Sequence, residues 1–175
     1  MLRRLRRVWL LAAAFALLVV SVPGAVAAPP WLTPEPAYVT LDPGVPAGSS
    51  VLPIISSGET LDGFLFEGIP DGIGMAPGPT AHTVNVFVAH EQTTVPFFGS
   101  ADFQDASVSK LTLSTAPGPG WGSVVAADVA IGPENGYLRF CSAAMVGPAE
   151  GVSQYTFFVG EETNDVVEVP AGAPY

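Results

Sequence analysis

The sequence predicts an all-β protein. Short apolar runs alternate with turn residues along most of the chain, and Val84, Val86 and Val88 recur at the period of two that is typical of a strand. No segment of helical length has the i, i+3, i+4, i+7 apolar spacing of an amphipathic helix. Strands and turns at this spacing are typical of a sandwich, a barrel or a propeller.

Residues 1–27 have the three parts of a signal peptide. An arginine-rich start is followed by an unbroken apolar run and then by an A-x-A site that ends at Ala27. The apolar run is shorter than the roughly 20 residues that a membrane-spanning helix needs. We therefore expect cleavage after Ala27 or Ala28, and a secreted, periplasmic or extracellular product without a membrane anchor. The Arg6–Arg7 pair leaves both Sec and twin-arginine export open.

After cleavage the chain is strongly acidic. Removal of the four N-terminal arginines leaves two basic residues, Lys110 and Arg139, against 16 acidic ones. Phosphate backbones would repel such a chain, which excludes nucleic acid as the main partner. Carboxylates suit hard cations such as Ca²⁺, and they also keep an exported protein soluble.

The remaining elements follow in chain order. Residues 28–50 are rich in Pro and Gly, which predicts an extended N-terminal segment. Residues 51–175 would form a single domain of ordinary size. Within this domain we expect apolar runs at 51–55 and 60–66, a turn at 68–72, and strands at 83–90, 107–113, 123–131 and 154–159.

Polar side chains that can bind metals lie beside the expected strands. Glu91 closes the clearest strand, Glu161 and Glu162 close the last one, and Cys141 follows a short apolar run. If these positions meet on one rim, carboxylates and a thiolate can share an ion. Taken singly, each also fits a solvated strand-end carboxylate or a buried thiol, because no second cysteine is present to pair with Cys141. A zinc-protease motif is incomplete, since Thr94 stands where the second histidine would be.

Five short motifs occur in an order that resembles the N-terminal part of the secreted PhoX-type alkaline phosphatases. They are GIPDGIG at 68–74, AHE at 89–91, ASVSK at 106–110, RFCS at 139–142 and GEE at 160–162. The resemblance covers residues 51–165. It implies a β-propeller, and because a blade takes roughly 40 to 45 residues, residues 51–175 would form an incomplete propeller of about two to three blades, truncated at the C-terminus.

The resemblance also implies a function. The complete protein would be an exported phosphoric monoester hydrolase that acts on a small phosphorylated substrate with iron and Ca²⁺ bound. Carried over residue by residue, Glu91, Cys141 and one or both of Glu161 and Glu162 would be metal ligands, with Asp71 or Glu162 near the ion.

One departure from the family pattern leaves two alternatives open. Ala89 stands where the family has an Asn before His-Glu, which removes one oxygen donor. The chain could instead be a non-catalytic, Ca²⁺-stabilised extracellular propeller or binding module. It could also be a small secreted β-sandwich with a buried Cys141.

Overall fold

The computed structural model of this chain describes residues 30–92, 106–162 and 166–170. Within these ranges the only helices are two short 3-10 turns, η2 (Pro133–Asn135) and η3 (Pro148–Glu150), which confirms the predicted all-β class. No helix of the described part is long and apolar enough to cross a membrane. The predicted signal peptide at 1–27 lies outside the described residues.

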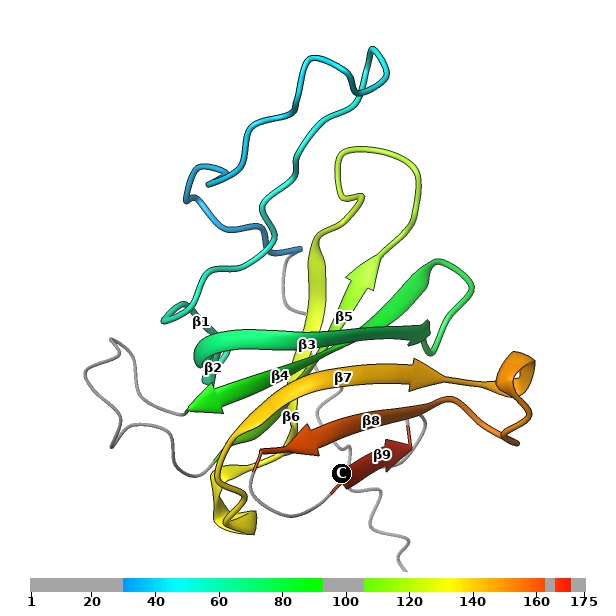
Figure 1. Cartoon of the computed structure of the whole chain (residues 1–175). Helices are drawn as coiled ribbons and strands as arrows, with labels where there is room; N and C mark the ends of the chain where they lie inside the picture. The colour runs from blue at the N-terminus through cyan, green and yellow to red at the C-terminus, as the bar shows by residue number, and fades with distance from the viewer. Residues whose placement is uncertain (1–29, 93–105, 163–165, 171–175) are drawn as a thin grey trace, which may run out of the picture.

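The strands form one hairpin and two antiparallel sheets (Figure 1). In both sheets the strands follow one another in space as they do in the sequence, so each sheet is a simple meander. The hairpin is β1 (Thr60–Leu61) and β2 (Phe64–Leu65); the first sheet is β3 (Gly68–Pro77), β4 (Thr83–Gln92), β5 (Ser107–Ser114) and β6 (Val124–Ile131); the second sheet is β7 (Phe140–Val146), β8 (Thr156–Glu161) and β9 (Val166–Pro170).

The strands expected at 83–90, 107–113, 123–131 and 154–159 are present as β4, β5, β6 and β8. The expected apolar run at 60–66 is divided by a two-residue turn, in which Asp62 and Gly63 have φ angles of 47° and 88°. Positive φ at both central residues is what a tight hairpin of this kind requires.

The turn predicted at 68–72 was wrong, because these residues begin the ten-residue strand β3. The glycines that suggested a turn serve a different purpose. A Cβ atom added to Gly72 would lie 2.7 Å from the backbone nitrogen of Ala143, so only glycine permits β7 to approach β3 this closely.

Alternation along β4 divides its side chains between two cores. Phe87 and Ala89 are fully buried against the second sheet, where the Phe87 ring stacks on Phe157 with centroids 5.6 Å apart. Val86 and Val88 point to the other face, into a cluster with the hairpin, β5 and β6. Strand β4 therefore carries one set of residues toward the second sheet and another toward the hairpin.

The N-terminal segment lies over the hairpin side of the first sheet. Residues 30–59 contain no regular strand, but Trp31 forms an isolated bridge with Val124 through two backbone hydrogen bonds of 2.9 Å. The Thr33 hydroxyl donates to Glu59 at 2.7 Å. These bonds hold the segment against the sheet although it is rich in Pro and Gly.

The two sheets stack through their first strands. Strands β3 and β7 run side by side and in the same direction (Figure 1). Because β6 lies at the opposite edge of the first sheet, the chain returns across the sheet before it begins β7. The start of β3, the end of β4, the start of β7 and the end of β8 consequently meet at one rim.

Candidate metal centre

Two β-bulges shape the rim where the two sheets meet. The β3–β4 register shifts between Pro70 and Ile73, and the β7–β8 register shifts between Phe140 and Ala143. Asp71 and Cys141 lie inside these two irregular segments. Bulges re-aim side chains and are frequent beside functional sites, which explains how two strands of different sheets point a carboxylate and a thiol at each other.

The backbone before Asp71 is also unusual. Ile69 has a φ angle of 42°, in the left-handed region that β-branched residues avoid. Its neighbour Pro70 pairs with His90 across the strands, after which the register shifts. Unfavourable backbone of this kind persists where the surrounding structure holds it, and it clusters at functional sites.

Asp71, Glu91 and Cys141 form the candidate metal centre. One ligand atom from each lies within 4.8 Å of the other two. The Cys141 thiol donates a hydrogen bond to Oδ2 of Asp71, with an Sγ–Oδ2 distance of 3.2 Å. Asp71 is exposed, whereas Glu91 and Cys141 are half-buried. The cluster is therefore open to solvent on one side.

The cluster concentrates negative charge. Burial, followed by hydrogen bonding with Asp71, raises the pKa of Glu91; the charge of Asp71 adds to this increase, whereas Arg139 lowers the pKa. The hydrogen bond to Asp71 is the largest cause of a raised pKa at Cys141, and burial and the charges of Asp71 and Glu91 add to it. Both shifts have the sign expected when acidic groups are gathered without a compensating cation.

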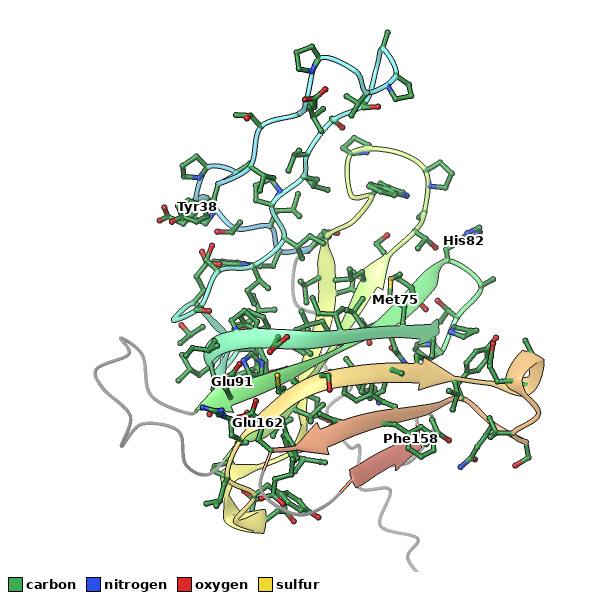
Figure 2. All side chains as sticks on the ribbon, in the orientation of Figure 1. Tyr38, Met75, His82, Glu91, Phe158 and Glu162 are labelled. Atoms are coloured by element: carbon green, nitrogen blue, oxygen red, sulfur yellow. The ribbon has the colours of Figure 1, made fainter. Side chains whose placement is uncertain are left out.

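The other two predicted ligands lie on the same rim but make different contacts. The Glu161 carboxylate accepts a hydrogen bond from the backbone nitrogen of Leu138 at 2.7 Å. Glu162 forms an ion pair with Arg139, whose Nε lies 3.9 Å from Oε2 of Glu91. Figure 2 shows Glu91 and Glu162 at the same end of the strands. Arg139 thus links Glu162 to the cluster, while Glu161 holds the backbone before β7.

A second polar cluster, which the sequence analysis did not identify, lies on the opposite face of β4. His90 is fully buried, and its Nε2 lies 2.8 Å from the Ser109 hydroxyl while its Nδ1 lies 3.4 Å from the carbonyl oxygen of Gly68. The neighbouring Ser107 hydroxyl donates to Glu67. Burial lowers the pKa of His90 to about 4 and raises the pKa of Glu67.

A cavity of about 540 Å³ lies far from the metal centre, at the other end of β3. Its lining includes Tyr155 and also Asn85 and Thr112, which are buried and hydrogen-bonded to each other at 2.9 Å. Asp71, Glu91 and Cys141 do not line it, so this cavity is separate from the candidate metal centre.

No protein-family model, no curated protein and no solved structure matches this chain.

Proposed function

We propose that this chain is part of an exported metal-dependent protein in which Asp71, Glu91 and Cys141 bind a cation. One observation carries the proposal: two bulged strands and the end of a third bring a thiol and two carboxylates within 4.8 Å of one another. Gathering these groups costs free energy unless a cation binds them, because each carboxylate repels the other and raises the pKa of the thiol. Bound metal would therefore stabilise the fold.

The donor set fits a metal ion. Ligand–metal distances of about 2.0 to 2.6 Å allow two donors of one ion to lie up to about 5 Å apart. A thiolate favours iron or zinc over Ca²⁺, whereas the carboxylates suit any of these ions. We therefore assign Cys141 to a site for iron or a similar metal, with Asp71 and Glu91 as oxygen ligands available also to Ca²⁺.

The proposed fold is a propeller segment with two neighbouring blades. Each sheet is a meander, and the chain returns from the outer edge of the first sheet to begin the second beside β3. This connection is what successive propeller blades require, whereas sandwiches commonly use Greek-key connections in which strands exchange order. The first strand of each blade would then line a central channel, with the candidate metal centre at one end of it.

For the whole protein we propose phosphate monoester hydrolysis, on the basis of the PhoX-type resemblance. A bound cation would supply Lewis acidity and offset the charge of a phosphoryl group. Arg139, 3.9 Å from Glu91, would keep this carboxylate oriented and ionised. Glu162, as the ion-pair partner of Arg139, would hold the guanidinium in place.

A non-catalytic, metal-stabilised binding module is the second candidate. Ala89 is fully buried where the resemblance calls for an Asn, so an oxygen donor is absent next to the cluster. Such a module would bind the cation but hydrolyse no phosphate ester.

Metal titration of the mature chain tests the proposal. Anaerobic Fe²⁺, Ca²⁺ and Co²⁺ should each be added to metal-free protein while its melting temperature is followed. Co²⁺ should also produce a thiolate-to-metal charge-transfer absorption. We expect Cys141→Ser to abolish this absorption, and Glu91→Gln or Asp71→Asn to weaken binding by about tenfold or more, equivalent to about 1.4 kcal/mol.

Glu134→Gln is the matched control, since Glu134 is exposed on η2 and should leave metal affinity unchanged. Glu161→Gln distinguishes the two ligand sets, because Glu161 belongs to the set predicted from the sequence but not to the set proposed here. We expect this variant to have little effect on metal affinity. Equal affinity in wild type and Glu91→Gln would overturn the metal proposal. Binding without hydrolysis of p-nitrophenyl phosphate would favour the binding module.

A further inference from the structure

The inner face of the first sheet changes from apolar to polar along β4. Phe87 and Ala89 point toward the second sheet and are fully buried in the apolar core. Two residues earlier on the same face stands Asn85, which is 5% exposed and lines the cavity of about 540 Å³. Positions between two packed sheets ordinarily hold apolar side chains, so the amide needs another explanation.

Only one end of the Asn85 amide is satisfied by the protein. Its oxygen accepts a hydrogen bond from the Thr112 hydroxyl at 2.9 Å, and within the described residues its nitrogen has no partner. Turning the amide over would exchange the oxygen and the nitrogen and would still leave one end unpartnered.

The unpartnered end of Asn85 is accessible from the cavity. In the described part of the chain, Trp31 Nε1 is the one unpartnered side-chain polar atom that is closed off from solvent, so the end of Asn85 without a partner reaches the open space that this residue lines. Buried polar groups are almost always hydrogen-bonded. An amide presented in this way indicates a ligand.

The connection between β7 and β8 forms another wall of the cavity. Tyr155 lines the cavity and is 40% exposed. A Cβ atom added to Gly147 would lie 2.5 Å from the ring of Tyr155, so the ring rests directly on the Gly147 backbone. The Gly147 nitrogen donates a hydrogen bond to the Glu150 carboxylate at 2.6 Å, which holds this turn in place. Figure 1 shows this connection and the β3–β4 turn at the same end of the stack.

The cavity lies within the stack of the two sheets. Its lining comes from β3, β4, β5, the β3–β4 turn and the residues between β7 and β8, and none of it belongs to β6 or β9, the outer strands of the described sheets. Its volume lies in the range of about 300 to 1,000 Å³ that is typical of small-molecule sites. We therefore expect a small molecule as the ligand.

The charges around the cavity favour a neutral ligand. Among the described lining residues only Lys110 is charged, and its register partner on β6 is Asp128. Cross-strand partners point to the same face, so these two opposite charges lie close together. The chain as a whole has a formal net charge of −10, which disfavours an anion further.

We propose that this cavity binds a neutral saccharide. The Tyr155 ring offers an apolar surface for the C–H face of a sugar ring, and Asn85 offers one end of its amide to a hydroxyl group. Sugar hydroxyls both donate and accept hydrogen bonds, so they satisfy Asn85 whichever way its amide is turned. Ser153 and Gln154 add a hydroxyl and a second amide to the lining. The site is independent of the metal centre and of the proposed phosphatase activity.

Heteronuclear NMR of the isotope-labelled mature chain tests this inference, with a chelator present throughout. The sequence has three Asn and three Gln residues, so the side-chain amide signals are few and can be assigned. Maltose, cellobiose, lactose, sucrose and trehalose should be titrated separately. We expect at least one of them to shift the Asn85 amide signals in a saturable manner and to leave those of Asn135, exposed on η2, unchanged. Inorganic phosphate should leave the Asn85 signals unchanged.

Two variants test the contacts with the disaccharide that binds most tightly. Asn85→Ala removes the amide and Tyr155→Ala removes the apolar surface, so each should weaken binding about tenfold or more. Asn135→Ala and Tyr38→Ala are the matched controls and should bind as the wild type does, since Asn135 lies on η2 and Tyr38 is 85% exposed in the N-terminal segment. Circular dichroism checks that each variant folds. Asn85→Ser, which keeps a hydroxyl beside Thr112, replaces Asn85→Ala if that variant does not fold.

Three results would overturn the inference. They are a wild type that binds none of these disaccharides, equal affinity in the wild type and in the folded Asn85 and Tyr155 variants, and a response of the Asn85 signals to inorganic phosphate alone, which would make the cavity an anion site. Because the chelator removes metal from every sample, failure of this inference and failure of the metal proposal are separate outcomes.

Discussion

Strand β4 carries two polar clusters on successive residues and opposite faces. On one face, Glu91 meets Asp71 and Cys141 at an open rim, where two carboxylates and a thiol are drawn together. On the other face, His90 is completely buried, with both ring nitrogens close to polar atoms of Ser109 and Gly68. The alternation of a β-strand is sufficient to separate the two environments.

The difference lies in how the polar groups are satisfied. At His90 the protein itself provides the hydrogen-bond partners, which is the ordinary condition of a buried polar group. At Glu91 the nearest groups are acidic, and Arg139 at 3.9 Å is shared with Glu162. A cluster whose hydrogen-bond partners all come from the chain itself indicates a structural role. A cluster that gathers groups of like charge indicates a site for a bound ion.

Removing the buried imidazole should have the largest effect on stability. His90→Ala leaves a cavity and deprives Ser109 of its partner, so we expect the free energy of unfolding to fall by about 3 kcal/mol. Urea denaturation measures this loss. His82→Ala is the control, since His82 is exposed and should lose almost nothing. A loss below 1 kcal/mol at His90 would contradict the structural role, and unchanged metal affinity in a folded His90 variant would support it.

The second-largest effect on stability should come from lowering the pH, which acts on the buried cluster around His90. The pKa of His90 is lowered from 6.5 to about 4 in the folded chain, so its stabilisation is complete above pH 6.5 and is lost as the pH falls toward 4. The total loss is about 3 kcal/mol at most. Unfolding experiments across this pH range measure the slope, and His90→Ala should remove the part due to the imidazole.

Glu67 and Glu91 change the stability with pH in the opposite direction to His90. The pKa of each is raised in the folded chain, so each contributes stability that is present at low pH and is lost as the pH rises through its folded pKa. If wild type and His90→Ala instead show the same change in stability between pH 6.5 and 4, the imidazole is not held neutral by burial.

The smallest effect should come from the open rim without metal. Glu91→Gln removes one of the repelling carboxylates but also the contact with Arg139, so in the presence of a chelator we expect stability to rise by less than about 1 kcal/mol. Urea unfolding of the metal-free variant measures this change. Glu134→Gln, exposed on η2, should cause no change. A loss larger than 1 kcal/mol would mean that Glu91 is part of a self-satisfied network like that of His90.

Local patterns were sufficient to predict much of the fold. The period of two at Val84, Val86 and Val88 corresponds to β4, and the apolar runs further along correspond to β5, β6 and β8. These signals are local because each strand alternates between a core and a second environment along its own length. The same patterns placed Glu91 at a strand end, and the structure places it one residue before the end of β4.

The sequence by itself also determined the acidic composition, the single cysteine and the candidates Glu91 and Cys141. The sequence analysis expected either Asp71 or Glu162 beside them, and only the tertiary structure decided that Asp71 is the one within 4.8 Å. It also decided that β3 is a strand and that Glu161 contacts the backbone of Leu138. The physical reason is that these facts depend on β7 packing against β3, about 70 residues away in the chain. The small residues of β3 permit close packing only where another sheet lies against this strand, and a bulge orients its side chains only after both strands are paired.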